Sequence, residues 1–552
     1  ISREAMADAE DHDSCSESSF LEREKNGDFL ITWQAHGLNY GLPNALLQQI
    51  EQGIHVIANG SRNMIEALKR SVPSLRVIEV TAPKEVLRAR LTARKRESAQ
   101  DIEQRLQRAA LAMPQGISCQ QVMNDMTLEI GISRLKAALL KSLQETPEVE
   151  RLLFQKICGQ HLSPADYQRL LPAVIQEHFH FSDVQAFLVA CTQQLQEDEI
   201  IAIAQARTLL YPRISWPKPM VVDKHSMGGI PGSRVTMVVV PIVAAHGLLI
   251  PKTSSRAITS AAGTADAMEV LARVDLNFEE VQQCVNATNG CIAWNGKLNH
   301  SVLDDALNPM VRPLGLDTRS WSVASILSKK FTAGATHVVI DIPYAESGKV
   351  KTEEEAIELA MLFERVGAAI GLVVKAFATN GNAPIGRGIG PALEARDVMQ
   401  VLDNHPDAPT DLLDKALFFC SQILALDPHV GHVDQGLLMA KKLLQSGAAR
   451  QSFEAIIAAQ GAIEVAARNV LQVEVRSDQS GVVRAIHGST ISQIARQAGA
   501  PRIQQAGVDL KKSIGEFVRE GEVLYLIQST HDGQLQMAHQ QAQRQHGYDI
   551  SN

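Results

Sequence analysis

A chain of 552 residues is too long for one hydrophobic core, and domain-size statistics predict about three to four compact units. Its composition, 45% hydrophobic and 21% charged, excludes a fibrous or an intrinsically disordered protein. The net charge is −8, and lysine and arginine are interspersed with acidic residues, which argues against a general nucleic-acid-binding surface. Small anionic ligands remain possible, because binding them requires only local positive charge.

The cysteines, the longest apolar run and the first residues bear on the compartment and the extent of the protein. The seven cysteines include no C-x-x-C pair, and their odd number fits neither a disulfide framework nor a zinc site, so we expect no bound metal and a reducing cytoplasm. The longest apolar run, 237–250, is interrupted by Pro241 and His246 and is too short to cross a bilayer. The first residues do not have the pattern of a signal peptide. They also lack a starting Met, so we expect a fragment of a longer protein.

The first 140 residues have the pattern of an α/β unit. Apolar runs at 53–60 and 75–81 predict strands, and residues 44–52 predict a helix. From 145 to 215 the apolar spacing is helical, and Ser163-Pro164 is typical of an N-cap followed by the first helical position. We expect a βαβ layout followed by an all-helical bundle.

After Tyr211-Pro212, glycine-rich turns alternate with long helices and buried strands. The predicted strands are 237–240, 336–342 and 371–377. They indicate a larger α/β domain at 216–465, with a ligand at the strand ends. Residues 466–530 predict a small β-rich α+β domain, and the Gln- and His-rich segment 531–552 predicts a disordered tail. The expected fold class is a multidomain α/β protein.

A glycine-rich turn at Gly386-Arg-Gly-Ile-Gly390 resembles a dinucleotide-binding loop only superficially. Its spacing fails G-x-G-x-x-G, and Pro391 follows at once. We expect a structural or a sugar-facing turn.

The segment 223–269 concentrates residue types that bind anions. Lys224 and Ser226 precede a run of glycines, so this turn can offer an ammonium, a hydroxyl and backbone amides to one anion. Further along, hydroxyls and Arg256 precede a Gly263-Thr264 turn into a helix, whose N-terminus would add donors. Each piece alone is typical of caps and turns. The residue types therefore indicate an oxyanion site and leave its ligand open.

Two stretches of this segment resemble the motifs of thymidine and pyrimidine-nucleoside phosphorylases. They are Lys224-His-Ser-Met-Gly-Gly229 and Ser254-Ser-Arg-Ala-Ile-Thr-Ser-Ala-Ala-Gly-Thr-Ala-Asp-Ala-Met-Glu269. The second is closer to the type 2 branch, which contains archaeal AMP phosphorylase. The resemblance covers residues 145–530. It implies that inorganic phosphate splits the glycosidic bond of a nucleoside or a nucleoside 5′-monophosphate.

The resemblance also implies roles for individual residues. Those that match phosphate-binding positions are Lys224, Ser226, Thr236, Ser254 and Thr264. Those that match substrate-contacting positions are Gly229, Ser255, Arg256, Ala257, Ile258, Thr259, Ser260, Ser325, Lys329 and Lys349. Asp317 matches the segment that holds the proton donor, so the implied catalytic residues are Asp317 and Lys224.

These residue types suit phosphorolysis, because the reaction builds positive charge on the sugar and negative charge on the leaving base. Preorganised donors must hold phosphate in line with the bond, and an acid must protonate the base. By residue type alone, Asp317 would be a turn residue before Thr318. Common thymidine phosphorylases place an arginine on the pyrimidine, and here Arg312 lies in a different register, which puts pyrimidine selectivity in question.

The first part of the chain resembles a different family. Two stretches, Phe29-Leu-Ile-Thr-Trp-Gln-Ala-His-Gly-Leu-Asn-Tyr-Gly-Leu-Pro43 and Val56-Ile-Ala-Asn-Gly-Ser-Arg62, resemble ribose 1,5-bisphosphate phosphokinase, a P-loop kinase related to guanylate kinase, and the match runs to about residue 110. Arg94, Arg96 and Arg105 match its lid, although by residue type alone they form a solvated helix face. Such a kinase needs G-x-x-x-x-G-K-[ST], which this sequence does not contain. We expect a truncated, inactive kinase-like part that would use ATP and Mg only with that loop restored.

The pairing of these parts bears on the substrate. The resemblance implies that AMP phosphorylases release the ribose 1,5-bisphosphate that the kinase consumes, which favours a nucleoside 5′-monophosphate over a nucleoside that yields (deoxy)ribose 1-phosphate. A thymidine-specific phosphorylase, a ribose 1,5-bisphosphate kinase in the full-length protein, and a non-catalytic nucleotide-binding regulator remain alternatives. We expect a homo-oligomer that takes inorganic phosphate as co-substrate, with no cofactor, nucleic acid or membrane as partner.

Overall fold

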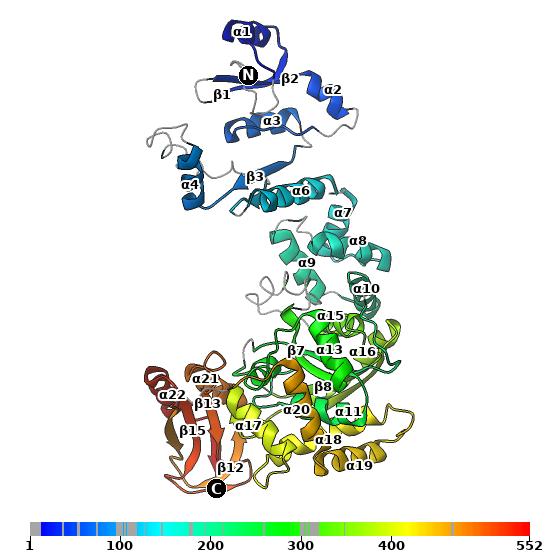
Figure 1. The fold of residues 1–552 in the computed structure, drawn as a ribbon, viewed down its shortest axis with the longest axis vertical. Helices are drawn as coiled ribbons and strands as arrows, with labels where there is room; N and C mark the ends of the chain where they lie inside the picture. The colour runs from blue at the N-terminus through cyan, green and yellow to red at the C-terminus, as the bar shows by residue number, and fades with distance from the viewer. Residues whose placement is uncertain are drawn as a thin grey trace. The chain divides into compact units, whose positions relative to one another are not determined.

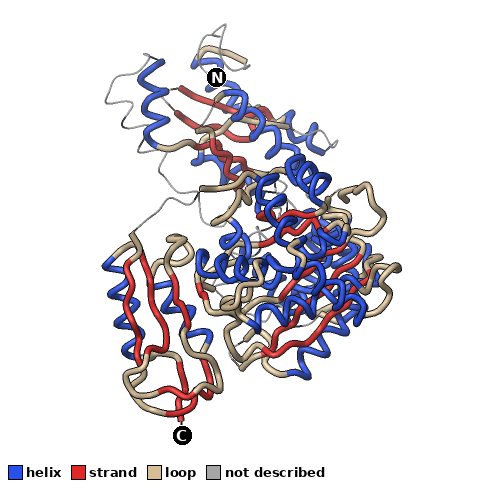
Figure 2. The backbone as a smooth tube through the Cα atoms, turned by 60° about the horizontal axis from the view of Figure 1, so that its bottom comes forward, coloured by secondary structure: helices blue, strands red, loops and turns tan. Residues whose placement is uncertain are grey.

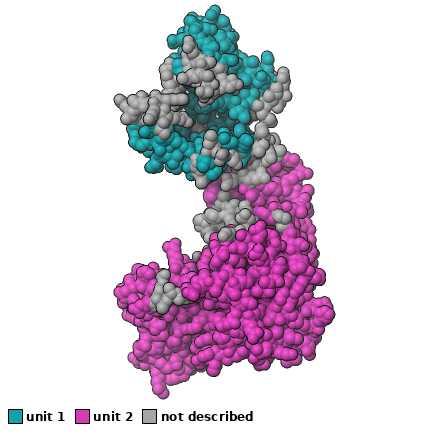
Figure 3. Space-filling view, in the orientation of Figure 1, with its two compact units in different colours: residues 1–146 teal, residues 147–552 magenta. Residues whose placement is uncertain are grey.

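The computed structural model of the chain describes residues 13–35, 38–51, 56–72, 75–94, 103, 106, 119–125, 127–144, 147–175, 179, 181–193, 195–211, 213–257, 260–297, 303, 307, 319–346, 348–464 and 469–551. Five residues with predicted roles lie outside these ranges: Arg96, Arg105, Ile258, Thr259 and Asp317. The chain divides into two compact units, residues 1–146 and 147–552 (Figure 3).

The first unit contains an antiparallel hairpin and a parallel strand pair. Its elements are α1 (Glu17–Lys25), β1 (Phe29–Ala35), β2 (Leu38–Pro43), α2 (Ala45–Glu51), η1 (Arg62–Met64), α3 (Ile65–Ser71), β3 (Val77–Thr81), α4 (Lys84–Arg94), β4 (Cys119–Met123) and α6 (Leu128–Gln144). β3 and β4 pair in parallel with α4 between them in the chain, which confirms the βαβ layout. The predicted helix at 44–52 and strand at 75–81 are confirmed as α2 and β3.

The predicted strand at 53–60 is wrong over its described part, 56–60, which has no regular secondary structure. Ile57 in this run is 75% exposed. A strand needs a hydrogen-bonded neighbour and a buried face, and the described residues give this run neither.

The second unit begins with helices. They are α7 (Pro147–Ile157), α8 (Pro164–Ile175), α9 (Phe181–Gln193) and α10 (Glu197–Thr208). The predicted start of α8 is confirmed, because the Ser163 hydroxyl accepts from Asp166 N at 3.3 Å and the Asp166 carboxylate accepts from Ser163 N at 3.0 Å.

The α/β part that follows is built on parallel strands with helices packed around them (Figure 1). Its elements are β5 (Val222–Ser226), α11 (Val235–His246), β6 (Ile250–Ser254), α12 (Thr264–Met268), α13 (Phe278–Thr288), β7 (Gly290–Trp294), η2 (Asn295–Lys297), α15 (Arg319–Thr332), β8 (His337–Tyr344), α16 (Glu353–Ala369), β9 (Val373–Asn380), β10 (Gly388–Ile389), α17 (Pro391–Leu402), α18 (Thr410–Leu424), α19 (Val433–Gln445) and α20 (Ala448–Gln460). The predicted strands at 336–342 and 371–377 are confirmed as β8 and β9.

The parallel strands share one carboxyl edge. β5 pairs with β8 and β8 with β9, while β6 pairs with β7. A parallel bridge between Val221 and Leu249 joins β5 to β6, which gives the order β7-β6-β5-β8-β9. Ligands of open parallel sheets bind beyond the carboxyl ends of the strands. Ser226 and Ser254 end two neighbouring strands at this edge.

The predicted strand at 237–240 is wrong, because this run is the middle of helix α11. Every residue from Val235 to Ala244 is buried, so the helix has no polar face and runs through the core. A short, wholly apolar, β-branched run has no period that distinguishes a buried strand from a buried helix. In the folded protein this run forms a helix that is buried on every side.

The C-terminal part combines two antiparallel sheets with two helices, and Figure 2 shows its strands side by side. Its elements are β11 (Leu471–Arg476), β12 (Gly481–Ile486), α21 (Gly488–Gln497), β13 (Gly507–Leu510), β14 (Phe517–Val518), β15 (Val523–Ser529), α22 (Asp532–Arg544) and β16 (Tyr548–Ser551). The sheets have the orders β10-β13-β15-β11 and β14-β12-β16.

The predicted disordered tail at 531–552 is wrong over its described residues. Helix α22 buries Leu535, Ala538 and Ala542, and β16 pairs with β12. The apolar residues of α22 recur at helical spacing among the glutamines, and this periodicity outweighs the polar composition.

The glycine turn at 386–390 is a structural turn. Gly388 and Ile389 form β10, which pairs with β13. A Cβ atom on Gly388 would lie 2.5 Å from the backbone of Leu393, so this close approach requires glycine. Within the part of the chain that the structure describes, no helix is long and apolar enough to cross a membrane.

Candidate active site

Strand β5 carries polar side chains to the carboxyl edge of the sheet on both of its faces. Because side chains alternate along a strand, Asp223 and His225 lie on one face while Lys224 and Ser226 lie on the other. The register with β8 places Ser226 beside Asp341. Each face therefore has its own cluster of charged groups.

On the Lys224 face, the buried Asp341 carboxylate collects four polar neighbours. Ser226 Oγ donates to Oδ2 at 3.0 Å, and Thr379 Oγ1 donates to Oδ1 at 2.6 Å. Lys415 Nζ and Lys224 Nζ lie 3.3 Å and 3.6 Å from Oδ2. Burial alone would raise the pKa of Asp341, but the two ammonium groups and the two hydroxyls lower it overall. Asp341 is therefore ionised at neutral pH.

Lys224 itself is 1% exposed, and its ammonium lies 4.8 Å from the centre of the Phe419 ring. Burial lowers the pKa of Lys224 to about 8, against the opposing effect of Asp341 and assisted by the charge of Lys415. Lys224 is therefore a cation at neutral pH that loses its charge in mildly alkaline solution.

On the opposite face of β5, two lysines share the Asp223 carboxylate. Lys330 Nζ lies 2.8 Å from Oδ2, and Lys252 Nζ lies 3.6 Å from Oδ1. Burial, and then the charges of these lysines and of Lys329, lower the pKa of His225 well below its usual value. The imidazole is neutral at neutral pH and adds no positive charge to the site.

The second predicted anion-binding element is held by its own carboxylates. Both terminal nitrogens of the Arg256 guanidinium contact Glu269, with Nη2 2.6 Å from Oε1, and the group lies over the Trp294 ring. Asp266 Oδ2 accepts from Ala257 N at 2.6 Å and from Gly263 N at 2.7 Å. The Gly263 amide that the sequence offers to an anion is thus already bonded.

Arg234 connects the two elements. It precedes α11, and its side chain is 8% exposed. Nη1 donates to Thr264 Oγ1 at 3.1 Å, and Nη2 donates to Ala262 O at 3.3 Å. Nε lies 2.6 Å from Glu394 Oε2 at the start of α17. This guanidinium fixes the Thr264 hydroxyl relative to the β5 loop, residues 227–234.

The remaining predicted residues lie on several elements. Lys349 Nζ donates to Met227 O at 3.2 Å and so joins the β5 loop, in which Gly229 is exposed with a φ of 100°. Thr236 is buried in the first turn of α11, and Ser325 is buried on α15. Ser254 and Lys329 are half-buried, Ser255 is exposed, and Ser260 Oγ donates to Ala262 O at 3.0 Å.

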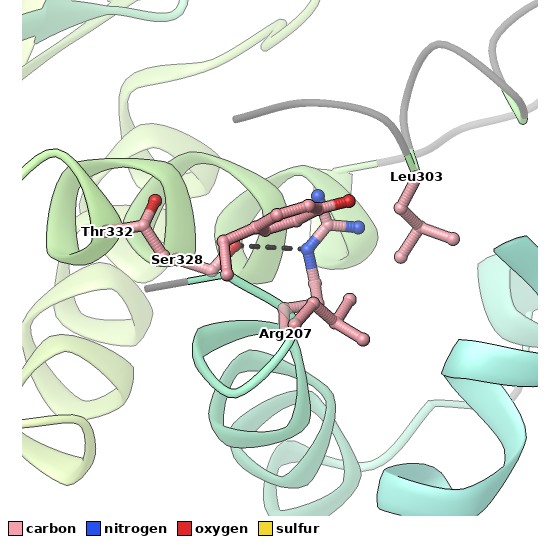
Figure 4. A pocket seen from close by; sticks show the side chains of 6 residues that line it. Arg207, Leu303, Ser328 and Thr332 are labelled. Atoms are coloured by element: carbon pink, nitrogen blue, oxygen red, sulfur yellow. Dashed lines mark hydrogen bonds between the residues drawn. The ribbon is translucent and has the colours of Figure 1, made fainter. Parts of the chain in front are cut away.

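A small cavity lies between α10 and α15 (Figure 4). Arg207, Leu303, Ser328 and Thr332 are among its lining residues, and Arg207 Nε donates to Ser328 Oγ at 3.0 Å. Its volume of about 10 Å³ has room for at most one water molecule. It is a packing feature beside the site.

Three site residues, Asp341, Thr379 and Lys415, lie outside the sequence motifs, whereas Arg234 and Asp266 lie within the segment 223–269, where no role was predicted for them. Asp341 is the one that a sequence pattern could have revealed, because it is an acid inside the apolar strand 338–342. Lys415 lies on an ordinary amphipathic helix, far along the chain from Lys224. Among the described residues, no group of His, Cys, Asp and Glu side chains could hold a metal ion.

A family model described as "Glycosyl transferase family, a/b domain" matches residues 218–450, which include both clusters. The part of the chain that carries the site is therefore an enzyme domain of the glycosyltransferase type. Among solved structures, anthranilate phosphoribosyltransferase from Thermus thermophilus is 18% identical with a TM-score of 0.47, covering 56% of this chain and 99% of that structure.

Curated relatives match both units. A "Bifunctional ribose 1,5-bisphosphokinase-thymidine phosphorylase" of Cupriavidus pinatubonensis is 52% identical over 96% of this chain and 88% of its own length. A protein of the same description from Azorhizobium caulinodans is 44% identical over 100% of this chain and 92% of its own. The chain belongs to this family of bifunctional proteins, which confirms the resemblance of each part.

Proposed function

We propose that residues 147–552 catalyse phosphorolysis of the N-glycosidic bond of a nucleoside 5′-monophosphate, giving the free base and ribose 1,5-bisphosphate. The site lies at the carboxyl edge of the parallel sheet. Inorganic phosphate is the co-substrate, and no other cofactor takes part in the proposed reaction.

One observation carries the proposal. The strands β5 and β6 are joined by the Val221–Leu249 bridge, and they bring the turn after Ser226 and the turn after Ser254 to one sheet edge. Arg234 then links the first turn to the Thr264 hydroxyl. Hydroxyls and a buried ammonium at neighbouring strand ends suit an oxyanion held in a fixed position.

The proposed roles follow from charge and position. Lys224, with the hydroxyls of Ser226, Ser254 and Thr264, holds inorganic phosphate for attack on the anomeric carbon. Asp317 is the proposed acid that protonates the leaving base, and its placement lies outside the described residues. Ser325, Lys329 and Lys349 are the proposed contacts to the nucleotide.

The preference for a 5′-phosphate rests on the fusion. Both relatives described above carry a name that joins a ribose 1,5-bisphosphokinase to a thymidine phosphorylase. A phosphorylase that releases ribose 1,5-bisphosphate would supply the substrate of such a kinase. A nucleoside such as thymidine would instead yield a sugar with one phosphate.

The test is a substrate panel. The protein is incubated with inorganic phosphate and AMP, CMP or thymidine, and free base is measured by chromatography. We expect base release from AMP or CMP that requires phosphate. Turnover of thymidine alone would refute the nucleotide preference. Phosphate-dependent binding without base release from any member would favour a non-catalytic regulator.

A matched pair of variants locates the site. Lys224→Ala removes the buried ammonium and should abolish most phosphate-dependent release. Lys375→Ala removes an exposed lysine of β9 in the same sheet and should leave the rate unchanged. Equal rates for the two variants would show that phosphorolysis occurs elsewhere.

We propose a second activity for the first unit when a G-x-x-x-x-G-K-[ST] loop is supplied, the phosphorylation of ribose 1,5-bisphosphate by ATP with Mg, because the relatives' description includes it. The proposed lid residues are Arg94, Arg96 and Arg105, whose side chains lie outside the described part of the chain. The test supplies ribose 1,5-bisphosphate, ATP and Mg to the protein with and without an added N-terminal segment that carries G-x-x-x-x-G-K-[ST]. Absence of phosphorylated product would exclude the kinase.

A further inference from the structure

Lys415 lies on α18 at the edge of the Lys224 cluster. Its ammonium is 3.3 Å from Asp341 Oδ2 and donates to Thr379 Oγ1 at 3.0 Å. The side chain of Lys415 is 12% exposed, whereas those of Lys224 and Asp341 are each 1% exposed. Lys415 is therefore the cation of this cluster that solvent and a ligand reach more easily.

The charges of the cluster do not balance. Asp341 is ionised, and one carboxylate offsets one ammonium. With Lys224 alone, an arriving phosphate would meet a neutral pair whose carboxylate repels it. Lys415 adds one positive charge, so the group of Lys224, Asp341 and Lys415 has a net charge of about +1 when both lysines are protonated.

Two partly desolvated ammonium groups beside one carboxylate are electrostatically unfavourable without a further anion. Burial is the main cause of the lowered pKa of Lys224, and the charge of Lys415 lowers that pKa further, against the effect of Asp341. An anion at the carboxyl edge of β5 and β8 would offset the excess. The hydroxyl of Ser226 is at the same edge, where it donates to the shared carboxylate.

We propose that Lys415 is the second cation of the phosphate site and binds inorganic phosphate together with Lys224. Asp341 then acts as a positioning residue that holds both ammonium groups at the strand ends. This inference rests on the proposed phosphorolysis for its kinetic test, and on phosphate binding for a test that is independent of turnover.

The kinetic experiment compares Lys415→Met with Lys415→Arg in the full chain. We expect Lys415→Met to raise the KM for phosphate at least about tenfold, because a charge-assisted contact is lost, with the KM for the nucleotide unchanged. Lys415→Arg keeps the charge and should recover most of the affinity. As a matched control, Lys441→Met removes an exposed lysine of the neighbouring helix α19 and should change neither constant.

Phosphate binding to the wild-type protein is then measured by calorimetry, and acetylation of single lysines is followed by mass spectrometry with and without inorganic phosphate. Phosphate should slow acetylation of Lys415 and not that of Lys441. This measurement needs no variant, so it decides the question even if Lys415→Met does not fold.

The inference is overturned if a folded Lys415→Met binds phosphate as tightly as the wild type, if phosphate does not protect Lys415, or if the wild type does not bind phosphate. Binding and protection without release of base from any substrate would instead support the role of Lys415 and refute the proposed phosphorolysis. The two failures are thus distinguishable.

Discussion

Arg234 and Glu394 form an ion pair of 2.6 Å in which the side chains are 8% and 1% exposed. The pair joins the residue before α11 to the first turn of α17, and the same guanidinium holds Thr264 Oγ1. Burial raises the pKa of Glu394 despite the neighbouring Arg234. The guanidinium therefore opposes the protonation that burial of Glu394 favours.

Replacing Arg234 by Met should cost about 3–5 kcal/mol of stability, because it leaves a buried carboxyl group without its partner. It should also weaken phosphate binding, since Thr264 loses its donor. The urea midpoint and phosphate calorimetry measure the two effects. Arg450→Met is the matched control, because its ion pair with Asp403 is partly exposed and should contribute less than about 1 kcal/mol. Equal midpoints for the two variants would contradict this prediction.

The pKa of Lys224, about 8, predicts the pH dependence of phosphate affinity. Below this pH the lysine is an ammonium and binds the anion, and above it the charge is lost, so the KM for phosphate should rise as the pH passes 8. Asp341→Asn removes the charge that favours the ammonium, so the rise should begin at a lower pH. A rise that begins at the same pH in both proteins would show that Lys224 is not the titrating group.

A buried carboxylate in the helical region, Glu199, should dominate the stability of that region. It accepts from Lys156 Nζ at 2.7 Å, from Tyr167 OH at 2.8 Å and from Leu162 N at 3.1 Å. Glu199→Gln removes the charge that offsets Lys156 and should cost about 3–5 kcal/mol. Tyr167→Phe removes one hydrogen bond to a charged group and should cost about 1.5–3 kcal/mol. Hydrogen exchange of the amides in α7, α8 and α10 measures both losses of stability. A larger loss in Tyr167→Phe than in Glu199→Gln would contradict this prediction.

Gly232 in the β5 loop should not tolerate a side chain. Its φ is 73°, and a Cβ atom there would lie 2.3 Å from Ile385 O and 2.9 Å from Gly388 O. Gly371 has a similar φ of 80° and open space around it, so Gly371→Ala should cost only about 1–2 kcal/mol from the backbone conformation. Gly232→Ala should lower the melting temperature clearly more. Similar losses in the two variants would show that the contact with the 385–388 turn can relax.

The sequence allowed those elements to be predicted whose local pattern is unambiguous. Ser163 and Pro164 define a helix start by chemistry that acts within one turn. The runs that became β8 and β9 have glycines at their boundaries. The run 237–240 was wrongly predicted as a strand, because burial on every side removes the periodicity that separates a helix from a strand.

The candidate site was predictable only where its residues lie together in the chain. Lys224, Ser226, Ser254 and Thr264 fall in two motifs within one short stretch of the sequence. Lys415 is paired with Asp341, which is distant in the sequence, and Arg234, although it lies in the same stretch, is paired with Glu394 on α17; no local pattern encodes such pairs. The structure was needed to show which carboxylates form ion pairs with the predicted cations, such as Asp341 with Lys224 and Glu269 with Arg256.

Strand β10 belongs to the chain of the α/β part, yet it hydrogen-bonds to β13 and forms the edge of a sheet whose other strands are all C-terminal. Arg396 of α17 reinforces the junction through Asp509 at 2.7 Å. A protein that begins at residue 466 would lack β10, which leaves the edge of β13 unpaired. Unpaired strand edges promote aggregation. The α/β part and the C-terminal part share one sheet, so we expect them to fold together and to be stable only in the intact chain.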